Sequence, residues 1–336
     1  MKAMVYNSST GLTIKEVPNP VAGPGKVTIK IKNCGICGSD LFLNKSGFLH
    51  EGSIMGHELS GIIDTVGEGI TGISPGDRVI ARPAGCNKCK NCEAGMENIC
   101  PERRSIGLGA FPGGFAEYML ADEDMIIPVP EKLTLDQACM ADQLGSVLHG
   151  MRVAGFKPGE SVLVTGAGPI GLCGVMLLKY FKAAKIIVAE LNPNRAELAR
   201  KFGADEVFDP TKKKMHSAIA EYFEPGRPDL VLECSGNAGA IQDIIMAAPV
   251  GCRIALVGMT MNPVTVIPYV LFQKHLSIFG SFGNTQKECI ECMDIMASGE
   301  VPSADLITRK IDIEELPDAF KELSSSKDEI KVMMEL

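Results

Sequence analysis

The stretch from Ser161 to Gly171 constrains the fold of this chain most. Its sequence, SVLVTGAGPIG, is an apolar run that ends in a glycine cluster, and the apolar run resumes from Leu172 to Tyr180. This order predicts a buried strand, a tight turn and a helix. Gly166, Gly168 and Gly171 have the spacing G-x-G-x-x-G, which is typical of a turn that brings the backbone close to a pyrophosphate at a helix N-terminus.

The residues after this glycine cluster indicate what it binds. Lys185 to Glu190, KIIVAE, read as a second buried strand, and Glu190 lies 19 residues after Gly171. A carboxylate at this place can bind both ribose hydroxyls of NAD. Because glycine clusters occur in many turns, the alternative interpretation is a doubly wound sheet that binds no dinucleotide.

The rest of this region has the rhythm of a parallel sheet. Asn192 and Pro193 predict the start of a helix that Gly203 ends, and its apolar side chains share one face. These are Ala196, Ala199 and Phe202. Apolar runs that stop at turn residues predict further strands over Asp229–Cys234, Arg253–Val257 and Leu276–Ser281. We therefore expect an α/β fold with a Rossmann doubly wound parallel sheet.

Length and charge limit the class of protein. A chain of 336 residues is long for one hydrophobic core, so two domains are expected. The net charge of −8 argues against nucleic-acid binding. Val162 to Leu178 is apolar, but it is shorter than the roughly 20 residues of a membrane span and contains Gly and Pro, so we expect no membrane segment.

The cysteines indicate metal binding rather than disulfides. The first residues, MKAMVYNSSTG, lack the apolar region of a signal peptide, so the protein is expected to be cytoplasmic. Twelve cysteines in such a chain favour metal sites. The first 80 residues also alternate apolar and polar positions, as at Val27, Ile29 and Ile31, which predicts a β-rich domain ahead of the parallel sheet.

The first candidate metal cluster lies in this β-rich region. Cys34 to Asp40, CGICGSD, is followed 20 residues after Cys37 by His57 and then Glu58. A thiolate, an imidazole and a carboxylate are ligands that zinc prefers. The alternative is that this cysteine and histidine are structural residues of the β domain.

The second cluster is CNKCKNCEAGMENIC. Its cysteines at 86, 89, 92 and 100 have the spacing C-x2-C-x2-C-x7-C, with few apolar residues between them. Four thiolates in a lobe without its own core favour a tetrahedral structural zinc. An iron–sulfur cluster is the rival, although the bacterial cluster spacing has x3 as its third gap.

Taken together, the motifs resemble the zinc-dependent medium-chain alcohol and polyol dehydrogenases. The resemblance covers nearly the whole chain and depends on GICGSD, GHE, the four-cysteine lobe, GGFAEY at Gly113 to Tyr118, and GAGPIG. It implies a GroES-like β-rich catalytic domain formed by residues 1–144 and 285–336, with the zinc lobe at 86–100. Residues 145–284 would form the Rossmann dinucleotide-binding domain.

The resemblance also assigns metal ligands. Cys37 and His57 would bind the catalytic zinc, and either Glu58 or Asp142 would supply the further carboxylate ligand. In having Asp at position 142, the chain resembles the secondary-alcohol dehydrogenases of the family. The structural zinc would be bound by Cys86, Cys89, Cys92 and Cys100. For Asp142 the alternative is a carboxylate at a helix N-terminus that binds no metal.

Roles in proton transfer and cofactor binding follow from the same resemblance. Asp40 would orient His57, and Ser39 would accept the hydroxyl proton of the substrate. Many relatives have a histidine where this chain has Phe42, so the relay would end elsewhere, at water or His50, which could equally be an exposed loop residue. NAD would be bound by Gly166, Gly168, Pro169, Ile170, Gly171, Glu190, Arg195, Val257 and Phe282.

We therefore expect an NAD-dependent zinc dehydrogenase, with one catalytic and one structural zinc, that acts on a secondary alcohol or polyol and its ketone. Phe42, Phe48 and Phe111 favour a less polar substrate. The enzyme alternative is a threonine or sugar-phosphate dehydrogenase, for which Arg103 and Arg104 are candidate anion ligands. The non-enzyme alternative is a zinc-stabilised structural or sensor protein. A homodimer or homotetramer is expected, without nucleic-acid or membrane partners.

Overall fold

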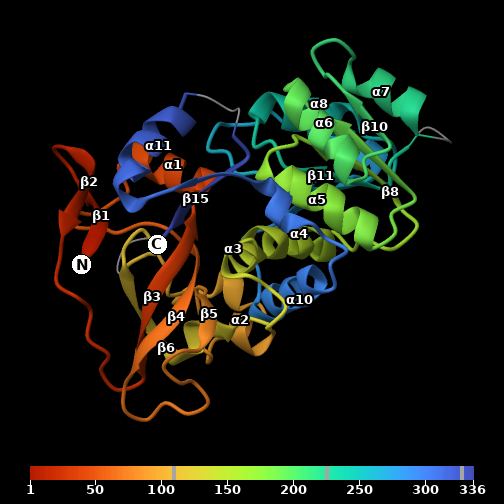
Figure 1. Cartoon of the computed structure of the whole chain (residues 1–336). Coiled ribbons are helices and arrows are strands. Elements are labelled where there is room, and N and C mark those ends of the chain that lie inside the picture. The colour runs from red at the N-terminus through yellow and green to blue at the C-terminus, as the bar shows by residue number, and fades with distance from the viewer. Residues whose placement is uncertain (108–110, 224–226, 326–328) are drawn as a thin grey trace. The chain divides into compact units, whose positions relative to one another are not determined.

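The computed structural model describes residues 1–107, 111–223, 227–325 and 329–336 (Figure 1). The chain divides into two compact units. Unit 1 contains Met1–Asp142 and Thr285–Leu336, and unit 2 contains Gln143–Asn284. Each unit has its own buried cluster of apolar side chains, as expected for a chain of this length.

Unit 2 is built on a parallel sheet with the strand order β10-β9-β8-β11-β12-β13. This order reverses direction on either side of β8, which is the topology of dinucleotide-binding folds. The expectation of a doubly wound α/β fold is therefore confirmed. The strands are β8 (Ser161–Thr165), β9 (Lys185–Ala189), β10 (Glu206–Phe208), β11 (Leu230–Glu233), β12 (Arg253–Leu256) and β13 (Ser277–Gly280).

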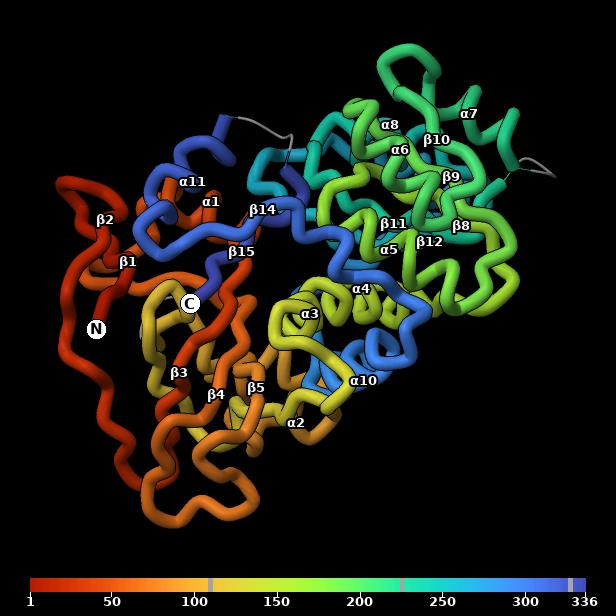
Figure 2. The backbone as a smooth tube through the Cα atoms, in the orientation of Figure 1, coloured from red at the N-terminus to blue at the C-terminus, as the bar shows by residue number. Residues whose placement is uncertain are grey.

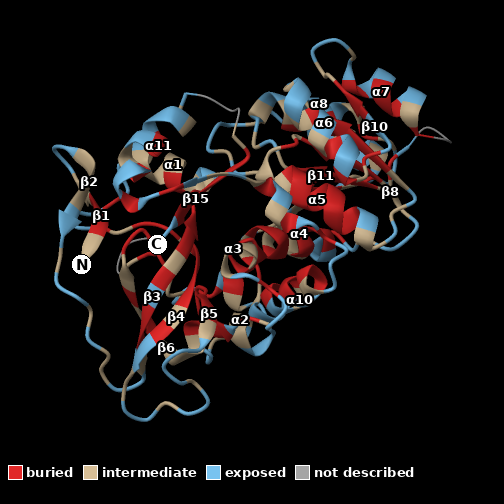
Figure 3. Ribbon diagram, in the orientation of Figure 1, coloured by how far each residue is buried: buried red, intermediate tan, exposed pale blue. Residues whose placement is uncertain are grey.

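The helices of unit 2 follow the strands as the sequence predicts. After β9, the Asn192 side chain accepts the N–H groups of Asn194 and Arg195, and Gly203 ends the helix in the left-handed region at φ 116°. Most of α5 is buried, as Figure 3 shows. The helices are α4 (Ala141–Val153), α5 (Pro169–Tyr180), α6 (Pro193–Phe202), α7 (Met215–Tyr222), α8 (Ala238–Ala247) and α9 (Pro268–Lys274).

Unit 1 is built on a sheet with the order β14-β15-β3-β4-β5-β7, and β6 also pairs with β3. The last strand, β15, runs antiparallel to β3 (Figure 2), so the end of the chain returns to the β-rich unit. A separate two-stranded sheet is formed by β1 and β2. The strands of unit 1 are β1 (Lys2–Asn7), β2 (Gly11–Glu16), β3 (Lys26–Gly35), β4 (Glu58–Val66), β5 (Arg78–Ala81), β6 (Tyr118–Asp122), β7 (Ile126–Pro128), β14 (Ile307–Ile311) and β15 (Lys331–Glu335).

Helices complete unit 1 around this sheet. Cys289 and Cys292 form a C-x-x-C sequence on α10, and both are buried, so they belong to the core of the unit. Burial raises the pKa of the Cys289 thiol to about 12. The helices are α1 (Gly38–Ser46), α2 (Lys90–Glu93), α3 (Leu135–Cys139), α10 (Gln286–Ala297) and α11 (Leu316–Leu323), with short 3₁₀ turns at Glu97–Ile99, Glu123–Met125, Ser303–Leu306 and Ile313–Glu315.

Within the described part of the chain, every helix is too short or too polar to cross a membrane. Among the described residues, the cysteines form no disulfide.

Candidate metal centres and dinucleotide site

Strand pairing brings the first predicted ligands together. β3 and β4 are antiparallel, with Gly35 opposite Glu58, so Cys37 just after β3 lies at the same end of the sheet as His57 just before β4. One ligand atom each from Cys37, His57 and Glu58 lies within 4.8 Å of the others. A sulfur, a nitrogen and an oxygen at this spacing are a suitable donor set for zinc.

Asp40 fixes the orientation of two of these ligands. Its buried carboxylate accepts the backbone N–H of Cys37 at 2.9 Å through Oδ2, and its Oδ1 lies 3.3 Å from Nδ1 of His57. The other ring nitrogen, Nε2, lies 3.3 Å from the Ser39 hydroxyl. With Nδ1 directed at a carboxylate, Nε2 is the nitrogen available to a metal, the arrangement that ligating histidines commonly show.

The charges around His57 also suit a metal. Burial opposes the protonation of its ring, but the Asp40 carboxylate and the Cys37 side chain outweigh it and raise the pKa of His57 well above its ordinary value. A site that stabilises a positive charge on the ring also attracts a cation, which would bind in place of that proton.

Glu58 is held by a residue that the sequence analysis missed. Lys331 on β15 donates to Oε2 of Glu58 at 2.7 Å and to the carbonyl of Ile36 at 2.9 Å, and both side chains are buried. Oε1 of Glu58 has no hydrogen-bond partner among the described residues. An orphaned buried carboxylate oxygen beside a thiol and an imidazole fits a metal ligand. A lysine inside the apolar stretch IKVMM was the available signal.

The structure does not place Asp142 in this close set. Its side chain shares the lining of a small cavity with His57 and Glu58, together with Arg82 and Cys289. The Asp142 carboxylate also interacts electrostatically with Arg103. Among the described residues, the group of possible ligands around His57 contains Cys37 and Glu58 but not Asp142.

The four-cysteine lobe forms the second possible metal centre. The sulfurs of Cys86, Cys89, Cys92 and Cys100 lie within 4.8 Å of one another. The backbone N–H of Lys88 lowers the pKa of the Cys86 thiol to about 7, which favours the thiolate that metals bind. The α2 helix inside the lobe buries none of its residues. Metal bonds would therefore replace the missing apolar core.

The glycine-rich loop of unit 2 has the predicted geometry. Gly166 follows β8 at φ 82°, and a Cβ on Gly171 would lie only 1.8 Å from the Gly166 carbonyl oxygen. Gly168 is the N-cap of α5 and provides no side-chain acceptor, while Pro169 and Ile170 form the first turn of the helix. The first N–H groups of α5 are thus left for an anion such as a pyrophosphate.

Two charged residues lie beside this loop. Oε2 of Glu190, which follows β9, accepts the N–H of Ala167, and Oε1 accepts that of Asn192 at 2.7 Å. Nη1 of Arg195 lies 3.6 Å from the position of a Cβ on Gly168. The carboxylate expected at the ribose and the arginine expected near the cofactor are therefore both next to the glycines.

The remaining predicted residues are spread over the ends of other strands. Val257 directly follows β12, and Phe282 follows β13 with 58% of its surface exposed. In unit 1, His50 is an exposed loop residue and Phe42 is half-buried on α1. Arg104 is engaged by the carboxylates of Asp122 and Asp124, which leaves it a poor candidate for binding a substrate anion.

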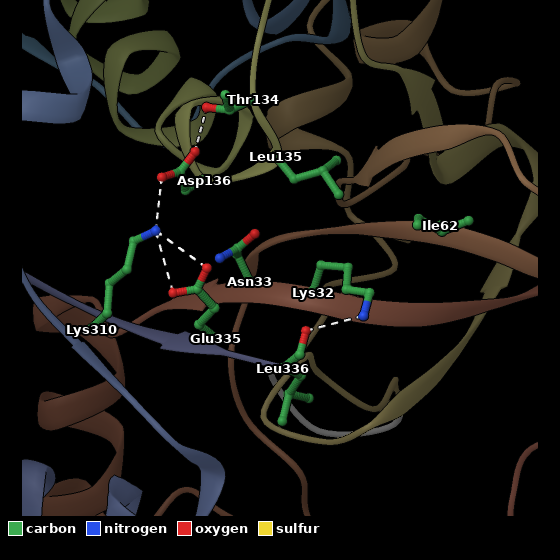
Figure 4. A pocket seen from close by; sticks show the side chains of 9 residues that line it. All are labelled: Lys32, Asn33, Ile62, Thr134, Leu135, Asp136, Lys310, Glu335 and Leu336. Carbon is green, nitrogen blue, oxygen red and sulfur yellow. Dashed lines mark hydrogen bonds and ion pairs between the residues drawn. The ribbon is translucent and has the colours of Figure 1, made fainter.

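A separate cavity of about 320 Å³ lies in unit 1 and contains none of the predicted ligands (Figure 4). Lys310 lies between Asp136 and Glu335, at 3.0 and 3.3 Å. Its positive charge is therefore compensated within the chain.

Family models and relatives identify this arrangement. Residues 23–131 match the alcohol dehydrogenase GroES-like domain, and residues 169–298 match the zinc-binding dehydrogenase family. L-threonine 3-dehydrogenase of Rhizobium johnstonii is 33% identical over 97% of this chain and 96% of the relative. Sorbitol dehydrogenase of Bacillus subtilis is 30% identical over 99% of this chain and 97% of the relative.

A solved structure agrees with these matches. A putative zinc-binding dehydrogenase from Sinorhizobium meliloti, bound to NADP, has a TM-score of 0.92 and 30% identity, and the match covers 100% of this chain and 99% of that one. The expected fold class, a GroES-like unit with a Rossmann unit, is confirmed. The chain therefore belongs to the zinc-dependent medium-chain dehydrogenases, oxidoreductases that act on CH–OH groups with zinc and a nicotinamide dinucleotide.

Proposed function

We propose that this chain oxidises a secondary alcohol or polyol to the ketone with NAD, at a catalytic zinc bound by Cys37, His57 and Glu58. The observation that carries the proposal is the convergence of these three ligand atoms within 4.8 Å, with Oε1 of Glu58 buried and without a partner among the described residues. Asp142, which lines the adjoining cavity, is the candidate for a further ligand. Bound zinc supplies Lewis acidity toward the substrate oxygen.

The chain's own residues hold this site and move the proton. Asp40 orients His57 through Nδ1, and Lys331 holds one oxygen of Glu58. The Ser39 hydroxyl lies next to the predicted ligand nitrogen of His57, where it can accept the hydroxyl proton of the substrate through a hydrogen bond. Because His50 is an exposed loop residue, water is the simpler end of the relay.

In unit 2, we assign the pyrophosphate of the cofactor to the loop of Gly166, Gly168 and Gly171 and to the first turn of α5. The Glu190 carboxylate would bind the ribose hydroxyls in place of its present backbone partners, with Arg195 beside the loop. A 2′-phosphate would meet this negative charge, so NAD is the preferred cofactor. Val257 and Phe282 would contact the nicotinamide end.

A threonine dehydrogenase is the second candidate, because the relative from Rhizobium johnstonii has that name. A sugar phosphate is less favoured as the substrate. Of the two candidate anion ligands, Arg103 and Arg104, the second is already engaged in ion pairs with Asp122 and Asp124.

We also propose that the protein is a cytoplasmic homodimer or a tetramer built from such dimers. β13 is an edge strand, and large exposed apolar side chains gather around it in the sequence. They include Met261 (70% exposed), Tyr269 (63%) and Phe272 (76%). A second copy could pair with this edge and bury these side chains. Free thiols in two proposed metal sites favour a reducing compartment.

The decisive experiment measures zinc per chain in the native protein and in Cys37→Ser, with Cys252→Ser as a control at a buried cysteine outside both clusters. We expect two zinc ions in the native protein and the control, and one in Cys37→Ser. Native enzyme is then assayed with NAD on secondary alcohols, polyols and L-threonine. An unchanged zinc content in Cys37→Ser would remove Cys37 from the catalytic site, and turnover of L-threonine alone would favour the second candidate.

A further inference from the structure

Glu233 is a buried carboxylate with no role in the proposed chemistry. It is the last residue of β11, and none of its surface is exposed. Because a carboxylate in an apolar interior is costly, a residue of this kind needs hydrogen bonds that compensate for its lost hydration.

The carboxylate of Glu233 connects the ends of two neighbouring strands. Its Oε1 accepts the backbone N–H of Ser235 at 2.9 Å, that of Gly236 at 3.2 Å, and the Ser235 hydroxyl. The same oxygen lies 3.4 Å from the hydroxyl of Thr165, the last residue of β8. The side chain therefore fixes the turn after β11 and anchors it beside the strand that leads into the glycine-rich loop.

The backbone of Glu233 reaches a third strand end. Its carbonyl accepts the N–H groups of Val257 at 2.9 Å and Gly258 at 2.8 Å, just after β12. A Cβ on Gly258 would lie 2.8 Å from Oε2 of Glu233 and 2.4 Å from the nitrogen of Gly236. The loops after β11 and β12 are thus packed backbone against backbone around this carboxylate.

The glycine-rich loop is part of the same junction. A Cβ on Gly166 would lie 3.0 Å from Cα of Ser235. Movement of the Ser235 turn toward Gly166 would therefore press on the loop that we assign to the pyrophosphate. In open parallel sheets, ligands bind at the carboxyl ends of the strands, at the point where the strand order reverses. In this sheet that point lies between β8 and β11.

We propose that Glu233 is a positioning residue for the dinucleotide, which holds the loops after β8, β11 and β12 so that the cofactor crevice is preformed. This inference rests on the proposed binding of NAD by unit 2. A preformed site does not have to order these loops when the ligand binds, so loss of the carboxylate should weaken cofactor binding. Burial raises the pKa of Glu233, while the N–H and O–H donors oppose that rise, which agrees with a carboxyl group retained for its hydrogen bonds.

The test is a fluorescence titration of the folded protein with NADH alone. Glu233→Gln keeps the shape of the side chain and one acceptor oxygen, but its NH₂ group, in place of Oε2, cannot accept the N–H of Gly236 that lies 3.3 Å from Oε2. Glu233→Asp shortens the side chain and withdraws the carboxylate from its donors. The matched control is Asp229→Asn, at the opposite end of β11, where Asp229 accepts the N–H of Ser161 at 2.9 Å.

We expect the NADH Kd to rise about tenfold in Glu233→Asp, to rise by a smaller factor in Glu233→Gln, and to stay within about twofold of native in Asp229→Asn. In steady-state assays the KM for NAD should rise by a similar factor, with a smaller change in kcat at saturating NAD. Native Kd values in folded Glu233→Gln and Glu233→Asp would overturn the inference. If native protein itself bound no NADH, the proposed cofactor site would fail instead.

Discussion

Lys331 and Glu58 form a fully buried ion pair between the last strand of the chain and the proposed catalytic centre. The ammonium lies 2.7 Å from Oε2, and 1% and 0% of the two side chains are exposed. Gly35 leaves room for the pair, since a Cβ there would lie 2.4 Å from the same carboxylate oxygen. One oxygen of Glu58 is thereby held, and the other is left for a metal.

Replacing Lys331 by Met should destabilise the protein by about 3–5 kcal/mol, because it leaves the Glu58 charge buried and unpaired. The control is Lys310→Met, whose ion pairs with Asp136 and Glu335 are partly exposed and should contribute less than about 1 kcal/mol. Urea unfolding of both variants in the metal-free form, in which no zinc compensates the charge of Glu58, would measure the difference. Equal losses of unfolding free energy in the two variants would show that the buried Lys331–Glu58 pair stabilises the protein no more than the partly exposed pairs of Lys310.

Replacing Ser39 by Ala should lower kcat for alcohol oxidation by about a hundredfold and change its pH dependence, because it removes the hydroxyl that lies 3.3 Å from the predicted ligand nitrogen of His57. Ser39→Thr keeps a hydroxyl and should retain most of the activity. Ser46→Ala is the control, since that hydroxyl donates to the Leu43 carbonyl and accepts the N–H of Phe48 at the end of α1, away from His57. A native pH profile in Ser39→Ala would place the proton relay elsewhere.

The native enzyme should prefer NAD over NADP by about a hundredfold in kcat/KM, because the Glu190 carboxylate repels a 2′-phosphate. Glu190→Gln should lower the ratio of kcat/KM with NAD to kcat/KM with NADP. Glu197→Gln, at an exposed position on α6, should leave this ratio unchanged. The relative from Sinorhizobium meliloti was crystallised with NADP. Assays of this enzyme with NAD and with NADP therefore test whether its cofactor preference differs from the one that this structure suggests for the relative. Equal turnover of the two cofactors by native enzyme would contradict the role of Glu190.

Local signals were enough to predict the strands and turns of unit 2. Gly166 and Asn192 act within a few residues of their own positions, and the structure confirms a turn at the first and a helix cap at the second. The four cysteines of the lobe are also close in sequence, so their convergence is a local property of the chain.

Contacts between residues far apart in the sequence could not be predicted from these local patterns. The pairing of Lys331 with Glu58 joins residues separated by 273 positions, and it depends on β15 lying beside β3. The same limit applies to Asp142. The resemblance suggested a place for it in the zinc site, but the structure places it in the lining of a cavity beside His57 and Glu58, outside the close ligand set of the described residues.

The stability of the protein should depend on pH through Glu233. Burial raises the pKa of its carboxyl in the folded state, so the folded protein binds a proton more tightly than the unfolded chain. This contribution to stability is fully present below the unfolded pKa and is lost as the pH rises through the higher folded value. The neighbouring Cys234 thiol stays neutral, because burial raises its pKa well above the ordinary value.

Glu233→Gln lacks this titration. The unfolding free energy of native protein, relative to that of Glu233→Gln, should therefore fall as the pH rises from the unfolded glutamate pKa of about 4.3 through the higher folded value. Urea unfolding at several pH values in that window would measure it. A constant difference between the two proteins would mean that the pKa of Glu233 is the same in the folded and unfolded states.

Removal of the two proposed zinc ions should have different consequences for stability. The lobe at 86–100 contains a helix without buried residues, so thiolate bonds to the metal would have to hold it together. Cys37, in contrast, lies between the core strand β3 and the helix α1. Cys89→Ser should therefore lose one zinc and lower Tm by about 4–8 °C, whereas Cys37→Ser should lose one zinc with little change in Tm. Calorimetry with metal analysis of the same samples would compare them, and an equal fall in Tm would show that the catalytic metal is as important for folding as the metal of the lobe.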